Sequence, residues 1–150
     1  MDESALNEHL HIMQWNARSV KCHLSDLKIT AYSTKPHVIA IQESWLKKKD
    51  KTPGFISYFT HRMDRVGRKG GGLMLLVRKN LHYIPKTLIS FQGGKLEVQA
   101  ISIKSNNQFI DIMNVYNPRG TLNKNEFIHY KSQLHPRYII VGDFNGHNPL

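Results

Sequence analysis

One stretch near the end of the chain, residues 138–147, has the sequence YIIVGDFNGH and guides the interpretation of the rest. Its first four residues are apolar and mostly β-branched, which is typical of a buried strand. Gly142 interrupts this run, and Asp143 and Asn145 follow it. Side chains two positions apart in an extended chain point the same way, so this pair would face one side and Phe144 the other. A carboxylate beside an amide at the end of a buried strand is suited to a binding or catalytic site.

A strand-ending turn is the alternative interpretation, because Gly, Asp and Asn are common turn residues. Three other apolar segments, however, also lead directly into polar residues. Each of these residues has a simpler interpretation by itself, as a turn residue, a surface charge or a core aromatic. Polar groups from several strand ends can converge in one cleft, and four separate coincidences are harder to accept than one site. The sequence therefore predicts a single site built from Asn16, Glu43, Tyr116, Asp143 and Asn145.

The remaining pattern predicts a mixture of strands and helices without an interdomain linker. Ser19 is expected to cap a helix on which Val20, Leu24, Leu27 and Ala31 recur at helical spacing, ending before Pro36. A short second helix is expected over residues 124–134, with Asn123 and Glu126 resembling a capping box. Strands are expected at residues 11–15, 38–41, 55–59, 73–77, 96–100, 109–115 and 138–141, the fifth and sixth of them paired as a hairpin.

The composition indicates a globular domain with an anionic partner. The chain has 150 residues, of which 40% are hydrophobic, and 21 Lys and Arg against 11 Asp and Glu give a formal charge of +10. This charge favours nucleic acid as a partner and an anionic membrane surface second, although a basic surface without a partner is the alternative. The single cysteine, Cys22, excludes a disulfide within the chain. Residues 47–51 and 62–72 are expected to be basic loops.

The sequence does not contain the motifs of three other kinds of protein. The glycine run at residues 70–72 could allow close backbone approach or simply form a turn, but no Lys-Ser/Thr pair follows it, so it is not a P-loop. The nine histidines include no His-Glu-x-x-His zinc pattern. No apolar run is long enough to span a membrane, and residues 1–4 are too polar for a signal peptide.

Four motifs stand in an order and at separations that match a known family: QWN at residues 14–16, IQESW at 41–45, NVYNP at 114–118 and GDFNGH at 142–147. With them, the chain resembles the endonuclease/exonuclease/phosphatase superfamily, which includes DNase I and the apurinic/apyrimidinic endonucleases. It is most similar to the endonuclease domain of non-LTR (LINE-type) retrotransposons. The resemblance implies an α+β fold, the DNase I-like four-layer α/β/β/α sandwich. Residues 1–9 would be a lead-in and residues 10–150 the N-terminal part of the domain.

The resemblance also implies a reaction and a role for each site residue. The reaction is hydrolysis of a phosphodiester with Mg²⁺ or Mn²⁺, with Glu43 as the metal ligand assisted by Asn16. Asp143 would handle the proton of the attacking water or orient that water. Asn145 and Tyr116 would donate hydrogen bonds to the phosphate oxygens. Contacts with nucleic acid are expected from Arg18, Lys47, Lys48, Arg65, Arg68 and Arg119.

The implied partners are duplex DNA, the rest of the domain and a reverse transcriptase in the same polyprotein, with the nucleus as location and no membrane. Two departures from the family pattern matter. Arg18 stands where some relatives have an Asp, and the sequence ends before the Ser-Asp-His segment whose His is central to catalysis; His147 belongs to the local motif instead. We therefore expect the N-terminal part of a nuclease domain, weak or inactive alone. The alternatives are a fragment that binds nucleic acid without cleaving it, and a phosphatase acting on inositol phosphates or lipids.

Overall fold

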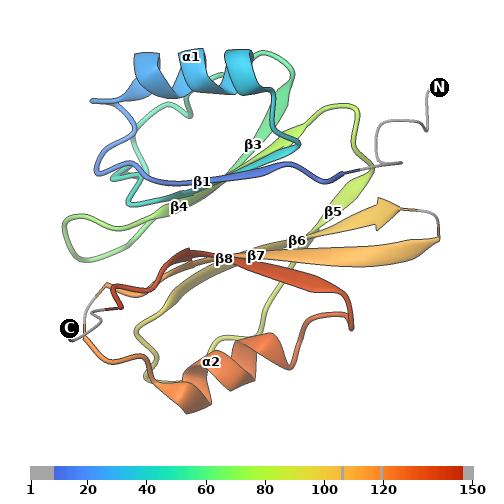
Figure 1. The fold of residues 1–150 in the computed structure, drawn as a ribbon. Coiled ribbons are helices and arrows are strands. Elements are labelled where there is room, and N and C mark those ends of the chain that lie inside the picture. Colours follow the sequence, from blue (N-terminus) through green and yellow to red (C-terminus); the bar gives the residue numbers. More distant parts are fainter. Residues whose placement is uncertain (1–8, 106, 119, 147–150) are drawn as a thin grey trace.

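The computed structural model of the chain describes residues 9–105, 107–118 and 120–146. Two four-stranded sheets pack face to face, with helix α1 (Leu24–Thr34) on the outer side of one and helix α2 (Lys124–Lys131) on the outer side of the other (Figure 1). The predicted α/β/β/α sandwich is thus confirmed. The predicted lead-in lies, except for residue 9, outside the described residues. Neither α1 nor α2 is long and apolar enough to cross a membrane, and these are the helices of the described residues.

The first sheet has the strand order β1-β2-β4-β3. Its strands are β1 (Ile12–Asn16), β2 (Val38–Gln42), β3 (Tyr58–Met63) and β4 (Leu73–Arg78), and only β1 and β2 run parallel. Strand β2 is apolar on both faces because both are covered. Ile39 and Ile41 pack toward Leu27 and Ala31 of α1, whereas Val38 and Ala40 pack toward the second sheet.

The second sheet has the order β5-β6-β7-β8, and its last two strands run parallel. The strands are β5 (Tyr83–Lys86), β6 (Glu97–Ser105), β7 (Gln108–Tyr116) and β8 (Tyr138–Asp143). Strands β6 and β7 form the predicted hairpin. Tyr130 of α2 covers Met113 and Val115 on one face, while Ile101 and Ile112 contribute to the core between the sheets.

Helix α1 begins later than expected. It starts at Leu24, its N-cap position is His23, and no side chain caps it. Ser19 instead lies in a turn with φ of 89°, and its hydroxyl accepts a hydrogen bond of 3.4 Å from the N–H of Cys22. Val20 is fully buried but precedes the helix. The prediction of Ser19 as N-cap was therefore wrong.

Two strand predictions also need correction. The strand expected at residues 55–59 is β3, which begins at Tyr58 and includes Arg62, a residue expected in a loop. Phe55 is buried ahead of it in the core beneath α1. The sequence pattern did not reveal β5, a short edge strand that contains Pro85, as edge strands can.

The amide of Asn123 caps α2 as predicted, accepting hydrogen bonds from the N–H groups of Asn125 (3.0 Å) and Glu126 (3.3 Å). Glu126 does not complete the capping box. Its buried carboxylate accepts from the N–H of Leu96 at 2.8 Å instead and so ties the helix to the segment that enters β6. The helix ends at Lys131, three residues earlier than predicted.

A buried carboxylate connects three elements of the second sheet at the end of the sandwich where β7 begins. Asp111 is fully buried and accepts from the hydroxyl of Ser102 at 2.5 Å and from the ammonium of Lys86 at 2.9 Å. His135 contributes its backbone N–H at 2.7 Å and its ring Nδ1 at 2.8 Å. Burial raises the pKa of Asp111, but these hydrogen bonds together outweigh burial and lower the pKa to about 2.

Asp111 should make the fold sensitive to acid. Its pKa lies below the ordinary value of 3.8, so its stabilising effect is present above about pH 4 and is lost as the pH falls toward 2. The shift corresponds to about 2 kcal/mol of unfolding free energy. Urea unfolding of the wild type and of Asp111→Asn at several pH values should show this acid-dependent part only in the wild type. Identical pH dependence of the two proteins would contradict the assignment.

Candidate active site

Four strands bring polar residues to one edge of the sandwich. In the first sheet, Asn16 ends β1 and lies opposite Gln42, the last residue of the parallel strand β2. In the second, Tyr116 ends β7 and lies opposite Asp143, the last residue of the parallel strand β8. The carboxyl ends of β1 and β8 lie at the same side of the molecule (Figure 1).

Asn16 joins the two sheets at this edge. Its amide Nδ2 donates to Oε1 of Glu43 at 2.9 Å and to Oδ2 of Asp143 at 2.6 Å. Its carbonyl oxygen accepts from the backbone N–H of Arg18 at 3.2 Å, which fixes the orientation of the amide. Two carboxylates from different sheets are thus held around one amide nitrogen. Its hydrogen bonds to both of them reduce their mutual repulsion.

The Glu43 carboxylate is fixed from a second direction as well. Its Oε2 accepts from the indole N–H of Trp45 at 3.1 Å. Both residues have left-handed backbone conformations, with φ of 53° and 54°. Such conformations are unfavourable for non-glycine residues and are found at sites where surrounding contacts impose them.

The glycine run supplies part of that surrounding structure. The carbonyls of Gly71 and Gly72 accept from the backbone N–H groups of Trp45 at 2.9 Å and of Ser44 at 3.1 Å. A Cβ at Gly72 would lie 2.5 Å from Oγ of Ser44, and the φ of Gly72 is 87°. Of the two roles that the sequence left open for this run, close backbone approach is therefore the one required here.

Tyr116 lies beside the two carboxylates, and it is 7% exposed. Burial, followed by hydrogen bonding to Glu43 and the negative charge of Glu43, raises the pKa of Tyr116 to about 12. The phenol therefore remains protonated at any ordinary pH and can act as a hydrogen-bond donor.

Arg65 is built into the structure next to Tyr116 instead of standing free on the surface. Its guanidinium lies over the Tyr116 ring, 5.7 Å from the centroid, and its Nε is 2.5 Å from Oε1 of Glu97. One of its terminal nitrogens, Nη2, is buried without a partner among the described residues. A Cβ at Gly71 would lie 2.2 Å from this guanidinium, so the glycine also makes room for Arg65.

Asn145 follows β8 but does not present a free amide. Its Nδ2 donates to the backbone carbonyl of Asn117 at 2.5 Å, and its backbone N–H donates to Oδ1 of Asp143 at 2.9 Å. In this structure it orients Asp143 and the loop after β7. A glycine is needed at position 142, directly before Asp143, because a Cβ there would lie 1.9 Å from the carbonyl oxygen of Val115.

Two buried amides directly behind the site were not predicted from the sequence. Asn114 and Gln42 are both fully buried, on β7 and β2, and the Gln42 amide donates to Oδ1 of Asn114 at 2.7 Å. The Asn114 amide in turn donates to the carbonyls of Ile41 at 3.0 Å and Met74 at 3.1 Å. The available signal was an amide side chain near the end of an otherwise apolar strand, which predicts a buried hydrogen-bond partner.

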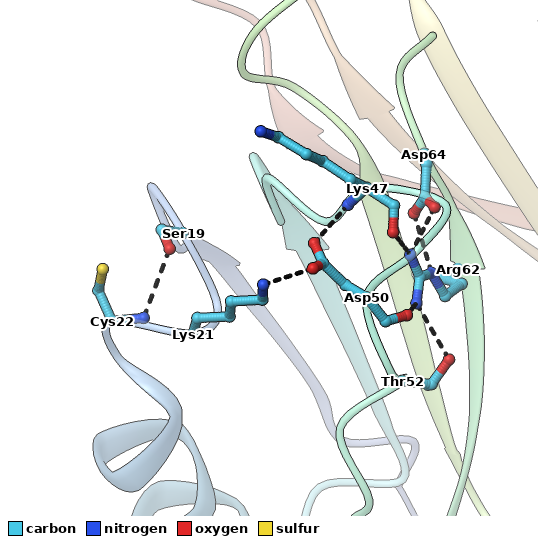
Figure 2. A network of polar contacts seen from close by, with 8 residues as sticks. All are labelled: Ser19, Lys21, Cys22, Lys47, Asp50, Thr52, Arg62 and Asp64. Atoms are coloured by element: carbon cyan, nitrogen blue, oxygen red, sulfur yellow. Dashed lines mark hydrogen bonds and ion pairs between the residues drawn. The ribbon is translucent and has the colours of Figure 1, made fainter.

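Residues 47–51, which we call the lysine loop, are held beside the site by a polar network (Figure 2). The carboxylate of Asp50 accepts from Lys21 Nζ at 2.6 Å and from the Lys47 N–H at 2.8 Å, and these hydrogen bonds lower the pKa of Asp50. Arg62 donates to the carbonyls of Lys47 and Asp50, each at 2.7 Å, and pairs with Asp64.

The predicted nucleic-acid contacts differ in exposure. Arg18, Lys47, Lys48 and Arg68 are exposed, whereas Arg65 is largely buried as described above. Arg119 and His147 lie outside the described residues. In Figure 2 the Lys47 side chain extends away from the network, so its ammonium group remains available.

The comparison with known proteins identifies the class to which this architecture belongs. The sequence profile of the Endonuclease/Exonuclease/phosphatase family matches residues 13–149. The chain belongs to that family, which confirms the resemblance inferred from the motifs. No match is found among the curated proteins.

Solved structures share the fold at low sequence identity. The endonuclease domain of TRAS1, a telomere-specific non-LTR retrotransposon, superposes with a TM-score of 0.70 at 19% identity over 91% of this chain and 61% of that one. An AP endonuclease from Archaeoglobus fulgidus superposes with a TM-score of 0.69 at 18% identity, over 91% of this chain and 58% of that one. The 3′ phosphatase NExo from Neisseria, bound to a product DNA hairpin, superposes with a TM-score of 0.59 at 17% identity, over 91% of this chain and 58% of that one. The chain spans about three fifths of the length of these proteins.

The buried amide link should make a measurable contribution to stability. Asn114→Ala removes a donor and an acceptor from the core and leaves the Gln42 amide nitrogen without the nearer of its two acceptors, at a cost of about 2–3 kcal/mol. Asn123→Ala is the control, because it removes an exposed cap of α2 at a cost of about 1 kcal/mol. Chemical denaturation of the two variants measures both values. Equal costs would argue against a structural role for the link.

Proposed function

We propose that this chain carries the metal-binding half of a site that cleaves phosphodiester bonds in DNA, as the nicking endonuclease of a non-LTR retrotransposon. The observation that carries the proposal is the contact of Asn16 with both Glu43 and Asp143, beside Tyr116, in a chain of this family. This arrangement supplies carboxylate oxygens and a neutral phenol donor at one sheet edge.

The donor set fits a hard divalent cation such as Mg²⁺. No three side chains of His, Cys, Asp and Glu gather into a metal cage within the described residues, but such ions use oxygen ligands and keep several waters. The carboxylates of Glu43 and Asp143 both accept hydrogen bonds from the Asn16 amide nitrogen, so negative charge from two sheets gathers at one place that attracts a cation. When bound, the ion would offset charge on the phosphate and the leaving oxygen.

Each residue of the site then has a distinct task. Glu43 supplies ligand oxygens, and the Asn16 and Trp45 donors keep its carboxylate in place. Asp143, oriented by the Asn145 N–H, accepts the proton of the attacking water or positions that water. Tyr116, which is hydrogen-bonded to Glu43 in this structure, would transfer its hydrogen bond to a phosphate oxygen as charge builds up there, and its raised pKa keeps it protonated for that role.

The roles of Asn16 and Asn145 are less direct than the family resemblance implies. Asn16 presents its amide nitrogen to the carboxylates, so it acts first as a bridge between them, and its oxygen faces the N–H of Arg18. Asn145 gives its amide to the carbonyl of Asn117 and must release it before it can contact a phosphate.

DNA is favoured over a lipid or inositol phosphate by charge. The formal charge of +10 and the exposed lysine loop suit a polyanion that extends over several phosphates. The structural neighbours include a retrotransposon endonuclease domain and an enzyme bound to DNA. A fragment that binds nucleic acid without cleaving it is the second candidate, and cleavage assays separate the two.

Metal binding can be tested independently of activity. Tb³⁺ bound at Glu43 should be sensitised by the indole of Trp45, which is hydrogen-bonded to that carboxylate, and should therefore luminesce. Glu43→Gln should weaken the signal strongly, because it removes the ligand carboxylate. Asp143→Asn should weaken it less, because it removes a negative charge next to the ion and not a ligand. Asp26→Asn, which removes an exposed carboxylate from α1, should leave the signal unchanged. Wild-type luminescence in Glu43→Gln would rule out the proposed metal site.

Cleavage is measured by nicking of supercoiled plasmid with Mg²⁺. In this assay, Asp143→Asn should reduce the nicking rate by about 100-fold or more, because it removes the proton acceptor. Nicking that survives both Glu43→Gln and Asp143→Asn would refute the assigned chemistry.

The lysine loop should contribute to the salt dependence of duplex binding. Lys48→Ser/Lys49→Ser should reduce the slope of log K against log salt by roughly one unit for each phosphate that is no longer neutralised. Lys79→Ser/Lys104→Ser removes the same charge from residues following β4 and at the end of β6, at the opposite end of the sheets. Binding measured by fluorescence anisotropy should therefore change less in this control. Equal slopes for the two double variants would mean that the loop is only solvated surface.

A further inference from the structure

Trp45 is a large aromatic side chain that is exposed next to the candidate active site. It is 44% exposed, although its indole N–H is bound to the Glu43 carboxylate. Its polar group is therefore satisfied by the site, while part of the apolar ring remains in contact with solvent. A ring placed in this way has a face that a ligand can cover.

The backbone around Trp45 holds the ring in position. Its N–H is bound to the carbonyl of Gly71 at 2.9 Å, and its φ of 54° is fixed by its neighbours on both sides. Ser44 is fully buried before it, and Leu46 is 3% exposed after it. The indole thus loses little conformational freedom when it binds a ligand, which favours affinity.

Positive charge continues directly from this ring. The lysine loop begins two residues after Trp45, and the hydrogen bonds to Asp50 and Arg62 give it a fixed course (Figure 2). None of the four lysine ammonium groups in the loop donates a hydrogen bond to another residue in the described part of the chain. An aromatic ring beside unpaired cations is the combination that binds single-stranded nucleic acid.

We propose that Trp45 stacks against an unpaired nucleobase next to the phosphate at the active site, while the lysine loop holds the adjoining backbone. The base must be unpaired or unstacked because neighbouring bases in a regular duplex cover its faces. The location of that phosphate rests on the proposed function. The inference gives the protein a preference for DNA with a flexible or open position at the cleavage site.

Stacking can be observed directly in the absence of cleavage. The chain has two tryptophans, so Trp15→Phe leaves Trp45 as the only indole. In EDTA, an oligothymidylate of about 12 nucleotides should quench its fluorescence. A duplex that contains the same strand should quench it much less at equal phosphate concentration. Binding without quenching would overturn the proposal.

Two variants separate the ring face from the hydrogen bond to Glu43. Trp45→Phe keeps an aromatic face and loses the N–H, whereas Trp45→Leu loses both. Trp45→Leu should weaken single-strand binding about 5- to 150-fold, the range expected for stacking of one base, and Trp45→Phe should bind nearly as the wild type does. The salt slope should remain unchanged in both, because neither changes charge. Equal losses in the two variants, or none in either, would overturn the stacking role.

The controls distinguish this inference from the proposed function. The two Trp45 variants should have the same unfolding temperature as each other, since the ring is partly exposed. A difference in binding between them then reflects the ring face and not a loss of folding. Suppose that Glu43→Gln still binds Tb³⁺, while the oligonucleotide quenches Trp45 in the Trp15→Phe variant. The proposed metal site is then refuted and the proposed stacking surface is supported. If Trp45→Leu binds the oligonucleotide as the wild type does while the Tb³⁺ signal still depends on Glu43, only the stacking surface is wrong. A wild-type chain that binds neither single-stranded nor duplex DNA would refute both.

Discussion

The interaction on which the site depends is the buried amide link between the two sheets. Asn114 of the second sheet is hydrogen-bonded to Gln42 and to two backbone carbonyls of the first, with no solvent exposure. Apolar contacts between sheets are not directional and tolerate sliding, whereas these hydrogen bonds have a required geometry. Glu43 follows Gln42 directly, and Tyr116 lies two residues beyond Asn114. The link therefore fixes the relative position of two site residues that come from different sheets.

The main features of the fold could be predicted from the sequence because they follow from apolar runs that are buried on both faces. Strands β2 and β4 and the second half of β7 are of this kind, and the polar residues at the ends of β2 and β7 marked Glu43 and Tyr116 as site residues. The start of α1 could not be predicted in the same way. Val20 continues the helical spacing of the apolar residues in α1, but the N–H groups of Ala17, Ser19 and Val20 are bound to the backbone carbonyls of residues 42–44. These residues therefore form backbone hydrogen bonds with a distant segment and not those of a helix.

The details of the candidate site were less predictable for a related physical reason. Side-chain type predicts which groups can meet but not which partner each one takes. Arg65 was expected on a nucleic-acid surface, yet Glu97 and the Tyr116 ring hold it within the fold. The Asn145 amide is bound to a carbonyl instead of facing the site. Both outcomes depend on strands far away in the sequence, β6 and β7, whose pairing a local motif does not describe.

Backbone strain is concentrated where the chemistry is proposed. Of the eight described non-glycine residues with positive φ, five flank the site: Arg18, Ser19, Glu43, Trp45 and Asn145. Each such conformation costs on the order of 1–3 kcal/mol, so stabilisation elsewhere must offset it. The apolar runs of β2, β4 and β7 and the buried Asp111 cluster lie behind or away from this edge and supply that stability. Holding Glu43 and Trp45 in these conformations orients a carboxylate and an aromatic face before any ligand arrives, so binding need not order them.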